Sequence, residues 1–201
     1  MMTSEKTANL PERDYSRVRM SFVPAPIQNR VPTCTVTLFD LYIYIKGFAA
    51  QSRTLCLRSI KDEKQAKKFK GYHLDFVLPS GVFSYCADNC LKEHSGIICI
   101  DLDHLEDVDA TKKQLLADPY WGEKTLLMFR SPRGGGLKWF LPIAPEQYEH
   151  RVWFQAIRNY LMKTYGFGAK QVDPACANES RACWLCHDKD VYLKAELYEY
   201  F

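Results

Sequence analysis

Two aspartates one residue apart end an apolar stretch of the sequence. Residues 97–100 are Ile-Ile-Cys-Ile, and Asp101-Leu102-Asp103 follows directly. The β-branched residues are typical of a buried strand, along which Asp101 and Asp103 would share one face about 7 Å apart. Two carboxylates at that spacing can share one or two hard divalent cations, and without cations or basic groups their charge is costly beside an apolar strand. The alternative is a solvated loop where the strand ends.

A glycine-rich connection further along the chain could bind phosphate. Residues 130–138 are Arg-Ser-Pro-Arg-Gly-Gly-Gly-Leu-Lys. Three successive glycines, Gly134, Gly135 and Gly136, let a backbone approach a phosphate closely and let amide groups point toward it. Arg133 and Lys138 place positive charge on either side. The alternative is the tip of an ordinary hairpin, although a hairpin needs only one or two glycines.

A third acid, Asp173, lies far from the first two in sequence. It precedes Pro174, and Arg181 follows at the start of the apolar segment 182–185. Asp173 could complete a metal site or cap a turn, and the spacing alone favours the cap, because Asp-Pro is a common turn start. An arginine at the mouth of a strand can pair with a buried acid or bind a phosphate through two nitrogens.

The composition is that of an ordinary globular chain. The 201 residues are 47% hydrophobic and 25% charged, and the net charge of +3 is too small to indicate nucleic-acid binding by itself. Lysines cluster over residues 61–70, which we interpret as the solvated side of a helix. The sequence contains no stretch of about 18 apolar residues, so it predicts no membrane span, and the N-terminus lacks the apolar core of a signal peptide. We therefore expect a cytoplasmic protein with no membrane partner.

Eight cysteines in a cytoplasmic protein are expected to be reduced thiols rather than a disulfide framework. Two spacings are partly those of zinc sites: Cys86-x3-Cys90-x3-His94 and Cys183-x2-Cys186-His187. Neither supplies four ligands at an established spacing, so we do not expect zinc.

The expected fold class is α+β, with a sheet covered by helices. Apolar spacing, capping residues and breakers predict helices over 37–47, 61–70, 107–119 and 145–165. They also predict strands over 72–78, 97–103, 125–129, 137–141 and 182–186, the third and fourth of these forming a hairpin. A strand is the competing prediction for residues 33–45.

The domain organisation expected from these elements has two parts. Residues 1–30 are polar and contain three prolines, which predicts an extended or flexible lead-in. Residues 31–201 then form one domain, with an N-terminal unit over 31–95 and a core over 96–201.

The ordered motifs resemble those of the archaeo-eukaryotic primase superfamily. More narrowly, they resemble the primase-like N-terminal domain of virulence-associated protein E (VirE-type) proteins of bacterial mobile elements. The resemblance rests on residues 100–103, residues 131–138, and Asp173 with Arg181, and it covers about residues 35–195. It implies a primase-polymerase-like core related to the RNA-recognition fold (RRM-like), extended by an N-terminal α/β unit.

The resemblance also implies an activity, DNA-templated nucleotidyl transfer with two Mg²⁺ or Mn²⁺ ions. Asp101 and Asp103 would be metal ligands and Asp173 the third catalytic carboxylate. Lys138 stands where the family more widely has the histidine of a Ser-x-His motif. The residues implied to bind the nucleotide or its phosphates are Ser131, Arg133, Gly134, Gly135, Gly136, Lys138, Arg181 and Lys189.

The implied partners are a DNA template, nucleoside triphosphates and a helicase or ATPase domain in the same chain or operon. Two other interpretations stay open. One is a catalytically inactive module that binds single-stranded DNA or a helicase partner. The other is a metal-dependent nuclease or phosphotransferase, since carboxylates and phosphate-binding cations suit both chemistries.

Overall fold

The computed structural model describes residue 10 and residues 13–198. In this part of the chain, two four-stranded antiparallel sheets and a separate hairpin form. We call β10-β7-β8-β6 the central sheet and β2-β1-β3-β9 the second sheet, while β4 and β5 pair only with each other. The strands are β1 (Met20–Val23), β2 (Cys34–Val36), β3 (Phe76–Leu78), β4 (Gly81–Phe83), β5 (Leu91–His94), β6 (Ile97–Leu102), β7 (Leu127–Arg130), β8 (Leu137–Pro142), β9 (Cys183–Trp184) and β10 (Tyr192–Leu193).

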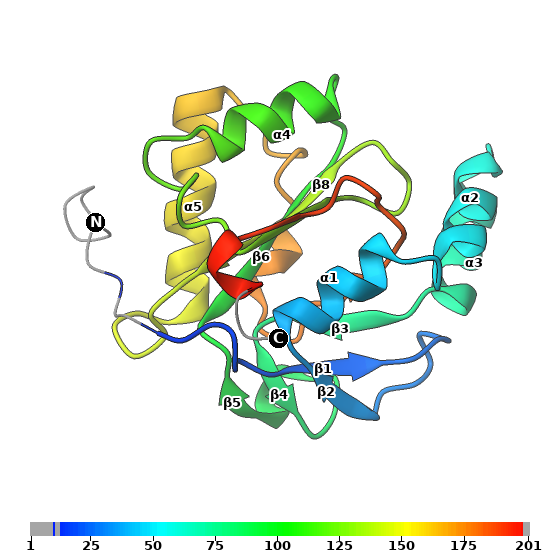
Figure 1. Cartoon of the computed structure of the whole chain (residues 1–201), viewed down its shortest axis with the longest axis horizontal. Helices are drawn as coiled ribbons and strands as arrows, with labels where there is room; N and C mark the ends of the chain where they lie inside the picture. Colours follow the sequence, from blue (N-terminus) through cyan, green and yellow to red (C-terminus); the bar gives the residue numbers. More distant parts are fainter. Residues whose placement is uncertain (1–9, 11–12, 199–201) are drawn as a thin grey trace.

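Helices cover one face of the central sheet, and one helix and the second sheet cover the other (Figure 1). Helices α4 and α5 pack on the first face, and α1 packs on the second. None of the helices in the described residues is both long and apolar enough to cross a membrane. The helices are α1 (Leu38–Lys46), α2 (Gln51–Ser59), α3 (Glu63–His73), α4 (Val108–Leu116) and α5 (His150–Tyr165), with short 3₁₀ segments η1 (Asp88–Cys90), η2 (Pro174–Ala177) and η3 (Ala195–Leu197).

Strand β6 pairs with β8 along its whole length, so that Asp101 lies opposite Lys138. Its side chains alternate between the two cores. Ile98 and Ile100 belong to the core under α4 and α5, whereas Ile97 belongs to the core between the central sheet, α1 and the second sheet. Asp101 is in phase with Ile97, so it faces the second sheet. The pattern of the strand therefore places the first acid between the two sheets.

Several predicted elements are confirmed, and so is the mixed α+β class with antiparallel sheets. Thr37 caps α1 with a capping box, and α1 ends at Gly47. Asp107 caps α4, and β7 and β8 form the predicted hairpin. The longest helix is present but starts at His150 rather than near residue 145. The segment before it forms a turn instead, in which the amides of Gln147 and Tyr148 both donate to one carbonyl.

Other elements depart from the prediction. The strand expected over 182–186 is only two residues long, and it pairs with β3 in the second sheet. Strand β1 lies within the predicted lead-in over 1–30, yet it pairs on both edges and its Met20 and Val23 are fully buried. The described residues 20–23 are thus part of the domain, and only 1–9 and 11–12 of that stretch lie outside the description. Helix α2 was not predicted.

Candidate functional site

The site begins with a buried ion pair between the two sheets. The ammonium of Lys138 contacts Asp101 Oδ2, and the side chains are only 6% and 10% exposed. Burial alone would lower the pKa of Lys138, but the Asp101 carboxylate outweighs it and the net pKa lies above its ordinary value. Lys138 is therefore a permanent cation. The second oxygen, Asp101 Oδ1, is buried and has no hydrogen-bond partner in the described structure.

The third acid lies directly beside the first two. Residues 171–173 run antiparallel to the end of β6, where Leu102 bridges Val172. The Asp103 amide donates to the Gln171 carbonyl at 2.9 Å, and the Asp173 amide donates to the Asp101 carbonyl at 3.0 Å. The structure therefore brings together the three acids that the sequence analysis singled out.

The side chain of Asp173 is already engaged. One carboxylate oxygen accepts from the Ala175 amide at 2.9 Å, which caps η2, and the other contacts the Arg181 guanidinium. The turn-cap interpretation is thus confirmed for Asp173. Its ion pair with Arg181 also fixes this arginine at the site.

Of the three acids, Asp103 has the fewest interactions through its side chain. It is half-buried, and its side chain forms no ion pair or hydrogen bond among those found in the described residues. Burial raises the pKa of Asp103, and the charges of Asp101 and Asp173 raise it further, while Lys138 acts in the opposite direction. Its ionised form is therefore destabilised by its surroundings, as expected of a carboxylate in a cluster of like charges.

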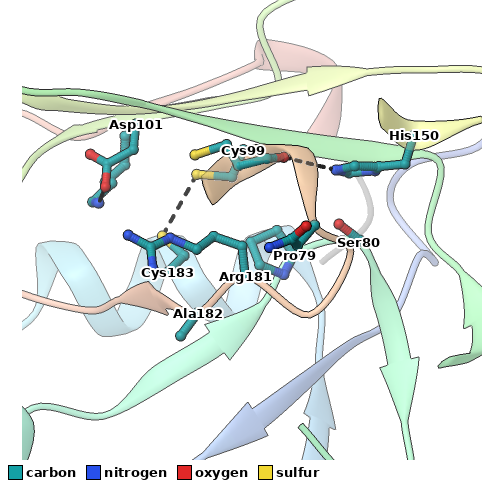
Figure 2. A pocket seen from close by; sticks show the side chains of 11 residues that line it. Pro79, Ser80, Cys99, Asp101, His150, Arg181, Ala182 and Cys183 are labelled. Atoms are coloured by element: carbon teal, nitrogen blue, oxygen red, sulfur yellow. Dashed lines mark hydrogen bonds and ion pairs between the residues drawn. The ribbon is translucent and has the colours of Figure 1, made fainter. Parts of the chain in front are cut away.

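A recess of about 280 Å³, measured together with the solvent at its mouth, opens next to this cluster. Figure 2 shows Asp101 and Cys99 of β6 facing Arg181 and Cys183 across it. Lys138 also lines it, whereas Asp103 and Asp173 are not among its walls. The recess thus combines one buried acid with two cations.

The glycine turn lies against the end of β6. A methyl group added at Gly136 would lie 2.0 Å from the Leu102 carbonyl oxygen and 3.2 Å from the Asp103 Cα, so only glycine fits there. The amides of Ser131 and Gly134 close the turn by donating to carbonyls within it. Those two amides are consequently not available to a phosphate, whereas the sequence analysis expected the amides of the turn to point toward one.

Two other candidate residues, Arg133 and Lys189, each pair with an acid outside the three-acid cluster. Arg133 pairs with Glu63 at 3.0 Å, so it lies between the glycine turn and the start of α3. Lys189 pairs with Asp190 on an exposed segment, and the other acids acting on it are Asp188 and Asp109. The structure therefore does not bring Lys189 to the three acids.

Comparison with protein families gives one result that covers more than half of the chain. Residues 70–193 match the family described as "BT4734-like, N-terminal domain". The chain belongs to this family. The comparisons with curated proteins and with solved structures each gave no significant match. The matched segment contains the three acids, the glycine turn and Arg181, whereas β1, β2, α1 and α2 precede it.

One residue of this BT4734-like domain was missed by the sequence analysis. Lys70 belongs to the lysine run that was interpreted as a solvated helix face, yet it is half-buried and its ammonium lies 5.7 Å from the centre of the Trp184 ring. The charged groups acting on it include Lys138 and Asp101. The sequence signal was the apolar residue Ala66, four positions before Lys70 and therefore on the same side of the helix, which the structure shows to be the buried side.

The oxygens available for a metal are few. Within residue 10 and residues 13–198, no three His, Cys, Asp or Glu side chains are arranged to hold a metal ion, and this includes both partial zinc spacings. The uncommitted oxygens at the site of the BT4734-like domain are Asp101 Oδ1 and the carboxylate of Asp103. Oxygen donors of this kind suit Mg²⁺ or Mn²⁺. Asp101 and Asp103 therefore offer oxygens of the right kind for one divalent ion but do not form a complete site, and a second ion would require Asp173 to leave Arg181.

Proposed function

We propose that this domain is a DNA-dependent nucleotidyltransferase of the primase-polymerase kind, acting in a replication protein of a mobile element. The observation that carries the proposal is the pairing of residues 171–173 with the end of β6. It sets Asp173 beside Asp101 and Asp103, with Lys138 and Arg181 in the same cluster. Carboxylates that can hold divalent ions, beside cations that can bind phosphate, suit two-metal nucleotidyl transfer.

The connectivity of the core supports a primase-polymerase-like fold. The elements follow in the order β6, α4, β7, β8, α5 and then the bridging segment 171–173. In space the bridging segment neighbours β6, β6 neighbours β8, and β8 neighbours β7, with α4 and α5 packed on one face. This is the β-α-β-β-α-β arrangement of ferredoxin-like and RNA-recognition folds. The second sheet would correspond to the N-terminal α/β unit that the resemblance to VirE-type primase-like domains implies.

The residues at the site would have distinct roles. Asp101 Oδ1 and Asp103 would hold a Mg²⁺ or Mn²⁺ ion, which would supply the positive charge needed to activate a primer 3′-hydroxyl and to neutralise the leaving phosphates. Lys138 keeps Asp101 in place and adds a fixed positive charge next to it. Arg181 would exchange its contact with Asp173 for a triphosphate oxygen, which would free Asp173 for a second ion. The glycine turn beside Asp103 would border the bound nucleotide.

The substrates in this proposal are a primed DNA template and nucleoside triphosphates. Because the strand would be held mainly through its phosphates, binding should weaken with salt and depend little on sequence. A helicase or ATPase domain in the same chain or operon would supply the unwound template.

The test is incorporation of labelled nucleotides on a primed template with Mg²⁺ or Mn²⁺. We expect wild-type protein to extend the primer and Asp103→Asn to lose activity by about 100-fold or more. Because the folded state raises the pKa of Asp103, removing its charge should not destabilise the protein. Asp190→Asn, which changes an exposed acid paired with Lys189, is the matched control and should keep full activity.

A second candidate function is favoured by the ion pairs themselves. Asp101 and Asp173 each already have a cation, so two of the three acids are neutralised without a metal. This would suit a module that binds single-stranded DNA or a helicase partner and does no chemistry. Binding of single-stranded DNA without any nucleotide incorporation would support it, whereas degradation of DNA without incorporation would indicate a nuclease.

A further inference from the structure

Lys70 differs from the other cations around the site in having no carboxylate partner. Lys138 pairs with Asp101, and Arg181 pairs with Asp173. Arg133 pairs with a glutamate of α3. Among the interactions of the described residues, the ammonium of Lys70 has neither an ion pair nor a hydrogen bond, and its contact is with the ring of Trp184. A half-buried ammonium without a counter-ion is poised for an anion from outside the chain.

The position of Lys70 is fixed by packing. Trp184 packs against the small core formed by Leu57, Ala66 and Leu74, which lies between α2 and α3. The stem of Lys70 therefore emerges from α3 beside the strand that follows Arg181. A cation over the face of a tryptophan ring is itself attracted to that ring. The ammonium is thus held at the edge of the site rather than extended into solvent.

The surroundings of Lys70 link it to the acid cluster. Beyond burial, the groups that act on its charge are Lys138, Asp101, Asp103 and Arg181. Burial lowers the pKa of Lys70, and the charges of Lys138 and Arg181 lower it further, while Asp101 and Asp103 act in the opposite direction. Lys70 on α3 is thus within electrostatic reach of Lys138 on β8 and of Arg181 before β9, while only the latter two line the recess itself.

We propose that Lys70 binds the triphosphate of the incoming nucleotide, together with Lys138 and Arg181. The inference rests on the proposed function and adds a third phosphate-binding residue to it. A compact anion with several charges suits cations grouped around one site, whereas the backbone of a DNA strand would need cations spaced in a row. The opposite side of α3, with the exposed Lys64 and Lys68, offers the latter arrangement.

The test uses the full chain and two phosphate probes, inorganic pyrophosphate and a single-stranded oligonucleotide, each titrated by calorimetry. Lys70→Met keeps the aliphatic stem along Trp184 and removes the charge. Lys68→Met is the control, because it removes the same charge roughly 200° around the same helix. We expect Lys70→Met to weaken pyrophosphate binding at least tenfold and Lys68→Met to change it less than twofold. Lys70→Arg, which keeps the charge, should stay within about threefold of wild type.

The inference is overturned if wild-type protein binds no pyrophosphate, or if Lys70→Met binds it as wild type does. It is also overturned if Lys70→Met weakens oligonucleotide binding instead of pyrophosphate binding. Should Lys70→Met not fold, Lys70→Gln takes its place under the same criteria. A loss of pyrophosphate binding in Lys70→Met together with no nucleotide incorporation by wild type supports the phosphate site and refutes the polymerase proposal. Nucleotide incorporation by wild type that Lys70→Met leaves unchanged supports the polymerase proposal and refutes the role of Lys70 in binding the triphosphate.

Discussion

The buried pair of Lys138 and Asp101 is the feature on which the electrostatics of the candidate site depend. A lysine at this position provides a charge that does not titrate near neutral pH, whereas a histidine would. Because both side chains are almost fully buried, each needs the other. The pair also leaves Asp101 Oδ1 buried and without a hydrogen-bond partner in the described part of the chain.

The pair makes a prediction about stability. Lys138→Met should lower the free energy of unfolding by about 3–5 kcal/mol, because it leaves the Asp101 carboxylate buried without a partner. Combining it with Asp101→Val should recover most of that loss. Urea unfolding of the two single variants and the double variant at neutral pH gives the coupling free energy. A single-variant cost below about 1 kcal/mol would mean that the pair is hydrated rather than buried.

At the scale of single residues, the sequence indicated the acids but not their partners. The alternation of β6 was enough to place Asp101 and Asp103 on one face. The contact of Asp101 with Lys138 depends on the register of β6 against β8, which no local pattern specifies. Lys189 was expected at the site but pairs with Asp190 elsewhere. The position of a residue in the sequence says little about whether its loop reaches the site.

At the scale of elements, the glycine turn between β7 and β8 positions the site through its backbone. The turn packs on the end of β6, where the Leu105 amide donates to the Gly135 carbonyl at 3.1 Å. Its glycines are not equivalent. Gly136 touches the Leu102 carbonyl, while nothing lies within 4 Å of a methyl group placed on Gly135.

This difference gives a matched pair of variants. Gly136→Ala should destabilise the protein by about 1–3 kcal/mol, because the turn or the end of β6 must move to accept the methyl group. Gly135→Ala should change the stability by less than about 0.5 kcal/mol. Thermal unfolding of both variants checks the prediction. Equal effects at the two positions would show that the turn is not held against β6.

Elements with strong local signals were predictable, and short strands were not. Helix α1 has a capping residue, a helical apolar pattern and a glycine after it, which together outweighed the competing strand. Strands β1 and β9 have four and two residues, too few for a period to be visible. Strand β3 lies between them and pairs with β1 along one edge and with β9 along the other. Both strands therefore depend on tertiary contacts that the local sequence does not show.

At the scale of the whole molecule, two histidines connect parts of the chain that the sequence separates. The Gly96 amide donates to His94 Nδ1, so the proton of His94 is on Nε2, which lies 3.3 Å from His150 Nδ1. His150 Nε2 in turn lies 3.1 Å from the Cys176 carbonyl oxygen. Strand β5, α5 and η2 are thus joined by successive hydrogen bonds through two neutral imidazoles, in which His94 donates to His150 and His150 donates to the Cys176 carbonyl.

These two histidines predict how the stability of the protein depends on pH. Burial, together with the charges of His150 and Arg13, lowers the pKa of His94 to about 4, and burial also lowers the pKa of His150. Since the unfolded chain takes up these protons near pH 6.5, stability should be complete above that pH and should fall between pH 6.5 and 4. Urea midpoints across this range should fall less steeply for His94→Gln than for wild type. The exposed His73→Gln is the control, and equal slopes for wild type and His94→Gln would contradict the assignment.

The docking of the two sheets could not be read from the sequence either. The expected division at residue 96 puts all of the motifs in one part, whereas the second sheet combines strands from both parts, at residues 20–23, 34–36, 76–78 and 183–184. The recess lies where β9 of the second sheet faces β6 of the central sheet. The candidate site therefore exists only when both sheets are assembled.

The most direct test of the account is the position of a metal ion in a crystal of the full chain soaked with Mn²⁺ and a nucleoside triphosphate. The account predicts an anomalous peak about 2.1 Å from Asp101 Oδ1 and from an Asp103 oxygen, with the triphosphate contacting Arg181. A crystal with the triphosphate bound elsewhere, and with no metal at either acid, would contradict it.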